Sequence, residues 1–334
     1  MESIDLINTD FIFDDRIEFI NRAKNVFRYQ IQHHPAYKIF SDHFAVSVED
    51  DSFLFRDIPL LPIRAFKETK LIIPDKSPEL TFKSSGTSSM KRSHHYIADS
   101  NLYKKAILSE FNHHFDLSNS VILGYTPGYN ENKNSSLIWM INLLIEESRS
   151  ELSQFLPLDV PLDDDLLAQI EKSGKNLILF GAAFGLLDLI DFKSVNLGSN
   201  TSIIETGGMK TQRREMNKSE LRKALSNGFG IPEKKIHSEY GMCELLSQFY
   251  AIGSEKFCFP HWTHVSIRDP KDSTRICQPG EEGKIGIIDL ANIYSCPFIL
   301  TDDRGVMDEE GRFKVLGRWN SSDLRGCNFL IDVD

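Results

Sequence analysis

The sequence predicts an α/β protein with a mostly parallel sheet, followed by a small antiparallel β unit. Helical segments alternate with short apolar strands over residues 17–227, the order typical of a parallel sheet covered by helices. From about Phe257 onward, short alternating segments are separated by Pro-Gly and Gly turns, a pattern typical of antiparallel hairpins. We therefore expect an α/β core over residues 1–256 and a β-rich subdomain over residues 257–334.

The expected elements follow from hydrophobic periodicity and from the positions of proline. An amphipathic helix is expected over residues 17–32, and the proline-rich segment 57–68 is expected to be extended. The elements expected after this segment are, in order, helix 101–114, strand 121–125, helix 135–148, helix 163–173, strand 176–181, helix 182–192, strand 202–206 and helix 218–227.

Composition and charge exclude several classes of function. With 38 basic and 48 acidic residues, the formal net charge is −10. This balance argues against a nucleic-acid partner, which requires a basic face. The longest apolar stretches are far too short to span a bilayer, and the first ten residues lack the pattern of a signal peptide. Five cysteines without a CxxC pair argue against disulfides and structural zinc, and they predict a cytoplasmic protein.

The segment FKSSGTSSMKRS, residues 82–93, has the composition of an anion-binding loop. Gly86 allows the backbone to approach a ligand closely, and successive amides and hydroxyls can donate to phosphate oxygens. The hydroxyls belong to Ser84, Ser85, Thr87, Ser88 and Ser89, and positive charge comes from Lys91 or Arg92. The Walker A spacing is absent, so a polar surface loop remains the alternative for this segment taken alone.

Two further segments follow strands of the expected sheet. In IIETGGMK, residues 203–210, a strand runs into a Gly-Gly turn on which a flat base can lie, although a plain strand-to-helix turn is the alternative. In IHSEYGMCELLSQFY, residues 236–250, Tyr240 can stack on a base and Glu244 can bind Mg²⁺. A core tyrosine and a glutamate in the first turn of a helix would explain the same residues.

A fourth segment, residues 299–328, contains adjacent aspartates after an apolar strand and an arginine after a hairpin. Carboxylates of this kind can accept hydrogen bonds from ribose hydroxyls, and an arginine can reach a phosphate or a ribose. The alternative is a hairpin with acidic turns, which the DEEG segment at 308–311 fits in part.

In this order, the four segments resemble the signature of the adenylate-forming enzymes, the superfamily of acyl- and aryl-CoA ligases and acyl-protein synthetases. The signature reads SSGTSSMK, TGGMK, YGMCE, TDDRG and GR in this chain. The sequences IPLLPIRAFK (58–67), FKSSGTSS (82–89) and RGCN (325–328) are most similar to the LuxE-type acyl-protein synthetases, the activating subunit of the fatty-acid reductase of luminescent bacteria. The resemblance covers about residues 30–330.

The resemblance implies a role for each matching residue. The phosphate loop would wrap the β- and γ-phosphates through Ser84, Ser85, Gly86, Thr87 and Ser88, with Lys91 as a catalytic cation. The adenine would lie against Gly207, Gly208, Met209, Tyr240 and Gly241. Cys243 stands where the family usually has threonine, near the adenylate phosphate. Glu244 would bind Mg²⁺, Asp303 would bind the ribose hydroxyls, and Arg318 would contact the ribose or a phosphate.

The implied fold is the large N-terminal domain of adenylate-forming enzymes. The sequence ends soon after the Gly-Arg hinge, so the mobile lid of about one hundred residues found in CoA ligases is expected to be absent or vestigial. The implied activity is ATP- and Mg²⁺-dependent activation of a carboxylic acid, most simply a fatty acid, and transfer to a cysteine thiol. Cys327, beside Arg325, is the expected nucleophile, and Cys243 is its rival. We expect the other cysteines, Cys258, Cys277 and Cys296, to be packing residues.

Several alternatives stay open at the level of sequence. The acyl group could pass to a partner acyl-reductase, to a carrier protein, to CoA or to a small amine. An aryl-acid activator resembling phenylacetate-CoA ligase and a non-catalytic nucleotide-binding subunit also fit the motifs. The acyl pocket is expected to be lined from residues 124–129, 136–144 and 180–190, and His261 is a weaker candidate near the adenylate. Acyl chain length and oligomeric state are not specified by these residues.

Overall fold

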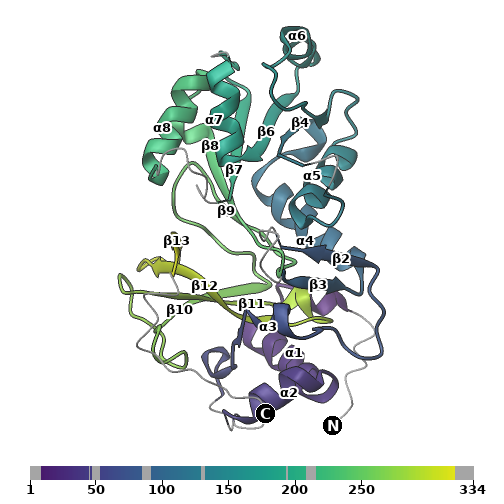
Figure 1. The fold of residues 1–334 in the computed structure, drawn as a ribbon, viewed down its shortest axis with the longest axis vertical. Coiled ribbons are helices and arrows are strands. Elements are labelled where there is room, and N and C mark those ends of the chain that lie inside the picture. The colour runs from purple at the N-terminus through teal and green to yellow at the C-terminus, as the bar shows by residue number, and fades with distance from the viewer. Residues whose placement is uncertain are drawn as a thin grey trace. The chain divides into compact units, whose positions relative to one another are not determined.

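The computed structural model describes residues 9–44, 46, 53–84, 92–128, 132–192, 195–207 and 216–319. The chain divides into two compact units (Figure 1). The central unit consists of Lys76–Pro260, and the terminal unit combines Met1–Asp75 with His261–Asp334. The division of the sequence between residues 256 and 257 stays a prediction. No helix of the described segments is both long and apolar enough to cross a membrane.

The central unit is built on a six-stranded sheet in the order β5-β4-β6-β7-β8-β9. Its strands are β4 (Ser120–Tyr125), β5 (Gln154–Phe155), β6 (Asn176–Ala182), β7 (Thr201–Thr206), β8 (Ile236–Tyr240) and β9 (Phe249–Ala251). All neighbouring pairs are parallel except β8 and β9. The predicted mostly parallel sheet is therefore confirmed.

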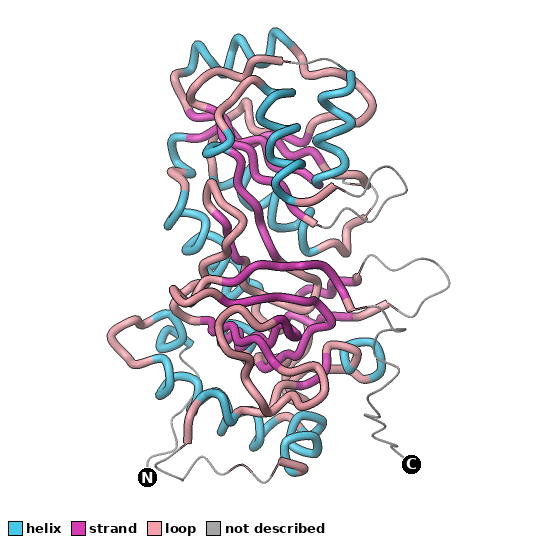
Figure 2. Tube along the Cα trace, turned by 90° about the vertical axis from the view of Figure 1, so that its left-hand side faces the viewer, coloured by secondary structure: helices cyan, strands magenta, loops and turns pink. Residues whose placement is uncertain are grey.

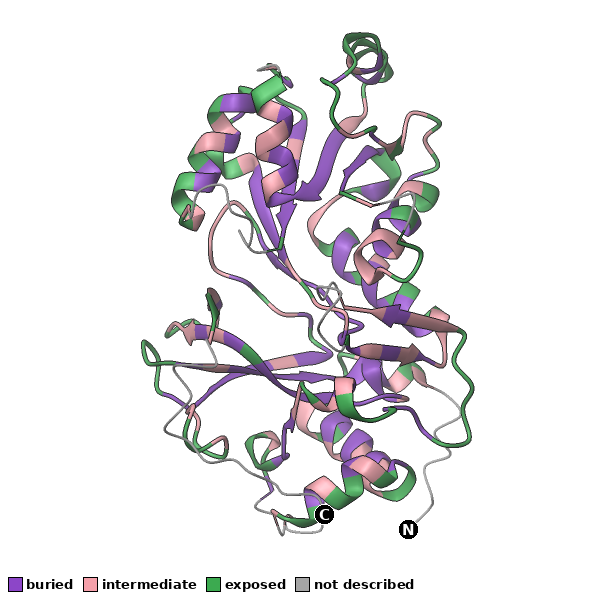
Figure 3. Cartoon of the chain, viewed as in Figure 1, coloured by how far each residue is buried: buried purple, intermediate pink, exposed green. Residues whose placement is uncertain are grey.

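Helices cover both faces of this sheet, with α7 and α8 on one side and α4 and α5 on the other (Figure 1). The helical elements are α4 (Ser100–His114), η3 (Leu117–Asn119), α5 (Ser136–Glu147), α6 (Asp164–Ser173), α7 (Ala183–Phe192), α8 (Lys218–Phe229) and η4 (Glu233–Lys235). The strands between them are buried (Figure 3), because helices on both faces remove both sets of alternating side chains from water.

Helix α8 shows how the sequence sets the helix boundaries in this unit. Asn217 accepts a hydrogen bond from the backbone of Glu220, whose side chain bonds back to Asn217, so the helix begins with a capping box. It ends at Gly230, whose φ of 63° is the left-handed conformation that glycine adopts without steric cost.

A buried arginine ties α8 to the segment before β8. The Arg222 guanidinium donates to the carbonyl oxygens of Ile236 at 2.6 Å, Glu233 at 2.8 Å and Ser254 at 3.1 Å. Only 6% of Arg222 is exposed, and burial lowers the pKa of its guanidinium. One side chain therefore fixes three backbone carbonyls that lie around the start of β8.

The central unit also contains a separate antiparallel hairpin of β2 (Leu80–Lys83) and β3 (His94–Ile97). Phe82 and Tyr103 pack at a ring distance of 5.6 Å, and Tyr103 stacks on Trp139 at 4.9 Å. These aromatic contacts anchor the β2–β3 hairpin on α4 and α5.

The terminal unit contains a five-stranded sheet in the order β1-β12-β11-β10, with β13 also paired to β12. Figure 2 draws the strands of the chain in magenta. Its strands are β1 (Leu61–Pro62), β10 (Thr263–Arg268), β11 (Glu282–Asp289), β12 (Phe298–Met307) and β13 (Phe313–Arg318). The pairs among β10 to β13 are antiparallel, which confirms the predicted antiparallel unit. Strand β1 joins it in parallel, with Leu61 opposite Ile299.

Helical segments, most of them from the N-terminal part of the chain, belong to the same unit as this sheet. They are η1 (Thr9–Phe13), α1 (Phe19–His33), α2 (Pro35–Asp42), η2 (Phe55–Asp57) and α3 (Ala65–Glu68), with η5 (Leu290–Asn292) between β11 and β12. Gln30 of α1 is fully buried, and its side-chain amide donates to the carbonyl oxygens of Ile293 at 2.6 Å and Ser295 at 3.2 Å. The expected helix over residues 17–32 is confirmed by α1.

The prediction that residues 57–68 are extended throughout is wrong in part. Only Leu61–Pro62 pairs as a strand, and Ala65–Glu68 forms a helical turn. Proline is absent after Pro62 in this segment, so no missing donor prevents a turn there, and the turn buries Phe66 to 1% exposure.

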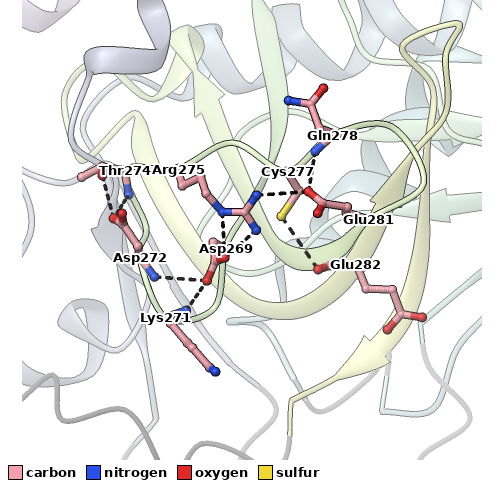
Figure 4. A network of polar contacts seen from close by, with 9 residues as sticks. All are labelled: Asp269, Lys271, Asp272, Thr274, Arg275, Cys277, Gln278, Glu281 and Glu282. Carbon is pink, nitrogen blue, oxygen red and sulfur yellow. Dashed lines mark hydrogen bonds and ion pairs between the residues drawn. The ribbon is translucent and has the colours of Figure 1, made fainter.

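The connection between β10 and β11 is closed by a polar network (Figure 4). Arg275 contacts Asp269 at 2.6 Å and Glu281 at 3.2 Å, while Asp269 and Asp272 accept bonds from backbone amides of the turn. The guanidinium is half exposed, so these ion pairs contribute little to stability and mainly fix the shape of the loop.

Candidate active site

The predicted phosphate loop connects the two strands of the β2–β3 hairpin. The Ser84 amide donates to the Ser93 carbonyl at 3.1 Å, and the Ser93 amide donates to the Ser84 hydroxyl at 3.0 Å. These two bonds close the base of the loop. The other predicted phosphate-binding residues, Ser85, Gly86, Thr87, Ser88 and Lys91, lie outside the described residues.

The predicted adenine turn follows β7 directly. Strand β7 ends at Thr206, and Gly207 has a φ of 82°, a backbone conformation that residues other than glycine rarely adopt. The chain therefore leaves the sheet at the carboxyl end of a central parallel strand, where open α/β sheets bind ligands. Gly208 and Met209 lie outside the described residues.

The predicted Tyr-Gly-Met-Cys-Glu segment begins at the last residue of the neighbouring strand, β8. Tyr240 is half-buried, with ring distances of 6.0 Å to Phe249 and 5.9 Å to Phe257. Glu244 is buried to 5% exposure, whereas Gly241 is exposed. The segment thus offers a partly accessible aromatic ring and a carboxylate near the same strand end.

A buried histidine connects the phosphate-loop hairpin to this segment. His95 of β3 is fully buried, and its Nδ1 lies 2.7 Å from the carbonyl oxygen of Cys243. This hydrogen bond holds the hairpin that carries Ser84 against the chain between Tyr240 and Glu244.

Paired side chains join the ends of β7 and β8. Thr206 lies opposite Glu239 in the sheet, and its hydroxyl donates to the Glu239 carboxyl. One position earlier, Glu205 lies opposite Ser238 and accepts a hydrogen bond from it. Lys218 of α8 completes the second pair with an Nζ–Oε1 distance of 2.5 Å to Glu205. Three of the four predicted segments therefore meet in the central unit.

The fourth predicted segment belongs to the terminal unit. Asp303 and Arg318 are register partners on β12 and β13, and Arg318 Nε donates to Asp303 Oδ1 at 2.9 Å. Asp303 is 8% exposed and Arg318 is largely accessible. The aspartate and the arginine assigned to the ribose and phosphate therefore lie side by side, at the end of the predicted hairpin.

Glu239 has an unusual protonation equilibrium. Burial raises the pKa of its carboxyl to about 7, and the nearby Glu205 carboxylate adds to the rise. The Thr206 hydrogen bond and the charge of Lys218 oppose it. A substantial fraction of Glu239 is therefore protonated near neutral pH.

Replacing Glu239 by glutamine should change how stability depends on pH. The folded-state pKa of about 7 lies above the ordinary value of 4.5, so the native protein binds the proton more tightly than the unfolded chain. The stabilisation is complete below pH 4.5 and is lost as pH rises through 7. We expect Glu239→Gln to gain about 3 kcal/mol relative to the unmodified protein across this window. Urea unfolding at a series of pH values checks this, and a constant difference would contradict it.

The cysteines correct part of the sequence-based picture. Burial raises the pKa of the Cys243 thiol well above its usual range, with Glu244 adding to the effect, which disfavours Cys243 as the rival nucleophile. Cys277 and Cys296 are buried as predicted, and burial raises the pKa of Cys296 to about 12. The prediction that Cys258 is a packing residue is wrong, because it is exposed. Cys327 lies outside the described residues.

The segments expected to line an acyl pocket lie around β4, α5, β6 and α7 of the central unit. A side chain at Gly124 would collide with Phe155 and Ile141, and one at Gly181 would collide with the Tyr125 carbonyl. These glycines therefore serve close packing, and the pocket stays a prediction. His261 belongs to the terminal unit, where its Nδ1 lies 3.2 Å from Arg22.

The single carboxylate of Glu244 fits a magnesium ion that is bound together with a nucleotide. Among the residues that the structure describes, no group of three or more His, Cys, Asp or Glu side chains is placed to hold a metal ion. Mg²⁺ is commonly bound by one or two carboxylates together with substrate phosphates and water. A single carboxylate such as Glu244 therefore suffices for that mode of binding.

Sequence reasoning missed the residues that join the predicted segments. Thr206, Glu239 and His95 received no role, although each precedes or faces a predicted site residue. A signal was present, because Glu205 and Glu239 each place a carboxylate within a short strand, directly before Thr206 and Tyr240. Charged residues are rarely fully buried unless they have partners.

Comparison with known proteins agrees with this architecture. The family model "Acyl-protein synthetase, LuxE" matches residues 145–333, which is more than half of the chain. The long-chain-fatty-acid–luciferin-component ligase of Vibrio harveyi is 25% identical over 339 residues, covering 91% of this chain and 85% of the relative. The ligase of the same name from Aliivibrio fischeri is 23% identical over 84% of this chain and 79% of the relative.

Solved structures show the same fold at low sequence identity. A 2-hydroxyisobutyryl-CoA ligase in complex with 2-HIB-AMP aligns over 90% of this chain and 67% of its own, with a TM-score of 0.66 and 12% identity. ATP-bound MatB from Rhodopseudomonas palustris aligns over 74% of this chain with a TM-score of 0.54 and 14% identity, and the match spans 49% of MatB. The fold is that of the adenylate-forming enzymes, and by its sequence this chain belongs to the LuxE family of acyl-protein synthetases.

Proposed function

We propose that this enzyme uses ATP to convert a fatty acid into an acyl-adenylate and then transfers the acyl group to a cysteine thiol. The observation that carries the proposal is the meeting of three predicted segments in the central unit, through the His95–Cys243 and Thr206–Glu239 contacts. Hydroxyls, backbone amides, an aromatic ring and a carboxylate are the groups that a magnesium–ATP complex requires. Membership of the family, and relatives named as long-chain-fatty-acid ligases, support the substrate class.

In the first step, a carboxylate oxygen of the acid attacks the α-phosphorus of ATP. The bond from that phosphorus to the oxygen bridging to the β-phosphate breaks, which yields acyl-AMP and pyrophosphate. The carboxylate itself is a poor electrophile, and adenylation turns one of its oxygens into part of a good leaving group. The protein therefore needs mainly to align the reactants and to neutralise phosphate charge.

The proposed roles follow the motifs. The loop that begins at Ser84 donates to the phosphates, and the Gly207 turn and Tyr240 hold the adenine. Glu244 would hold Mg²⁺, which when bound neutralises charge on the phosphates. Asp303 accepts hydrogen bonds from the ribose hydroxyls, and Arg318 contacts the ribose or a phosphate.

In the second step, a thiolate attacks the carbonyl carbon of the acyl-adenylate. The carbon–oxygen bond to the phosphate breaks, AMP departs, and a thioester remains, while the thiol proton has already passed to solvent. We assign this thiol to Cys327, because Arg325 lies two positions before it in the sequence and the raised pKa of Cys243 disfavours that alternative. A partner acyl-reductase or a carrier protein would then receive the acyl group.

A covalent adduct provides the direct test. The protein is incubated with ATP, Mg²⁺ and a panel of alkyl and aryl acids, and its intact mass is measured. We expect a hydroxylamine-labile acyl adduct with fatty acids, lost in Cys327→Ala, while acid-dependent ATP–pyrophosphate exchange by that variant stays within about twofold, because only the second step needs the thiol. Cys258→Ala, which removes an exposed cysteine, should keep both activities.

The same experiment separates the competing functions. An adduct that persists in Cys327→Ala would place the acyl group on another residue. Exchange without any protein adduct would favour a ligase that uses CoA, a carrier protein or an amine. Nucleotide binding without pyrophosphate release from any acid would indicate a non-catalytic binding subunit.

A further inference from the structure

The carboxyl group of Glu239 lies at the junction of the two strand ends that lead into the proposed adenine site. Its position in β8 is immediately before Tyr240, and its register partner Thr206 is immediately before Gly207. A residue at this point contacts both sides of the site without belonging to either motif.

Two contacts fix the carboxyl group in place. One oxygen accepts the hydrogen bond from the Thr206 hydroxyl. The other, Oε1, lies in the space that a Cβ at position 241 would occupy, so a larger residue there would have to displace the Glu239 carboxyl. The side chain is 5% exposed, so little movement is open to it. Glu239 therefore touches both the end of β7, at Thr206, and the chain after Tyr240, at Gly241.

A second tie between the same strands lies on the opposite face of the sheet, because successive strand residues alternate. It consists of Glu205, Ser238 and Lys218, and it has the cation that a buried carboxylate usually requires. Glu239, by contrast, is bonded to the neutral hydroxyl of Thr206. The two ties therefore respond differently to protonation.

We propose that Glu239 is a positioning residue that joins the end of β7 at Thr206 to the end of β8 at Tyr240, and that nucleotide binding selects its protonated carboxyl. This inference rests on the proposed function, because it concerns the same nucleotide site. It goes further because it assigns to the site a residue, Glu239, whose protonation affects nucleotide binding and which lies outside the motifs.

The surroundings of Glu239 support a proton-dependent role. Its pKa of about 7 places the change of charge near neutrality. The charged and titratable groups around it are Glu205 on β7, Lys218 on α8, Tyr250 on β9, Glu110 and His114 beside Tyr250 on α4, and His237 on β8. Burial lowers the pKa of His237 to about 4, so that ring stays neutral over the range in which Glu239 titrates.

A bound nucleotide should shift this equilibrium toward the protonated form. The ligand brings negative charge and removes water, and both effects disfavour a nearby carboxylate. By linkage, a group that holds its proton more tightly in the complex makes affinity fall as pH rises. A difference of about one pKa unit between free and bound protein corresponds to roughly tenfold in affinity.

Calorimetric titration with Mg·ATP, from about pH 6 to about pH 8.5, tests the inference. We expect the affinity of the unmodified protein to fall roughly tenfold across this range. Glu239→Gln keeps an acceptor for Thr206 and carries no charge. The roughly tenfold fall in affinity that we attribute to Glu239 should therefore be absent from this variant. The ligand titrates equally in both proteins, so the difference between them reports Glu239 alone. Glu110→Gln, which alters another buried carboxyl of the unit, should retain the original pH profile.

A second pair of variants tests positioning without altering a charge. Thr206→Val removes the hydroxyl and keeps the shape, so the KM for ATP should rise roughly tenfold while kcat stays within about twofold. Thr206→Ser should restore the original KM. If Glu239→Gln keeps the original pH profile, or Thr206→Val leaves the KM unchanged, the inference is overturned while the proposed function stands. If the unmodified protein binds no ATP and releases no pyrophosphate, the proposed function fails.

Discussion

Replacing Glu244 by glutamine is expected to lower acid-dependent ATP–pyrophosphate exchange by roughly 100-fold or more. Glutamine has the size of glutamate but lacks the charge that Mg²⁺ prefers among its ligands. Because Glu244 is 5% exposed and lies after β8, its replacement changes the electrostatics of the strand end without opening a cavity. Exchange is measured over a series of Mg²⁺ concentrations, and a raised Mg²⁺ requirement should accompany the loss of rate.

Glu110→Gln is the matched control for Glu244→Gln. Glu110 is also 5% exposed in the central unit, where it pairs with His114 at 3.0 Å on α4. This control separates the loss of a buried carboxylate in general from the loss of the proposed Mg²⁺ ligand. Equal exchange rates for Glu244→Gln and the unmodified enzyme would exclude Glu244 from the reaction.

Arg222→Ala should destabilise the central unit by about 3–5 kcal/mol. Its guanidinium donates to three carbonyl oxygens, and truncation leaves these acceptors without that donor in a place that water hardly reaches. Each buried group that loses its partner carries a desolvation cost. Urea unfolding followed by circular dichroism measures the loss as a lower midpoint at an unchanged slope.

Two further variants define the origin of that loss. Arg222→Lys keeps the charge but offers a single ammonium in place of a planar fork, so it should recover only part of the stability. Lys223→Ala removes the neighbouring exposed cation of α8 and should stay within about 0.5 kcal/mol of the unmodified protein. If Arg222→Ala unfolds at the same urea concentration as Lys223→Ala, the three carbonyl bonds contribute no net stability.

The central sheet could be predicted because its signals are local. Strands β4 and β6 are mainly apolar, and β7 has Ile203 and Ile204 at its centre, so the type and order of these elements follow from local sequence patterns. Strand β1 could not be recognised in this way. Its two residues pair with Ile299 and Leu300 on β12, and such a pairing depends on contacts between distant parts of the chain.

The site was predictable in its motifs but not in its connections. Gly207 and Tyr240 stand out because a glycine directly after a strand and a tyrosine at the end of a strand have recognisable sequence patterns. The bond from Thr206 to Glu239 depends on the register of β7 against β8, which a shift of one residue would abolish. The contact of His95 with Cys243 likewise requires the hairpin to be docked on the unit before it can be inferred.

The pairing of β1 with β12 also determines when each part of the molecule can fold during synthesis on the ribosome. Helix α1 and strand β1 emerge early, yet Ile293 and Ile299, which they contact, are among the last described residues to be made. The central unit is continuous in the chain, so all of its partners are available sooner. We expect the nascent N-terminal segment to wait, with its apolar face uncovered, until translation has almost finished, and to depend on chaperones for that interval.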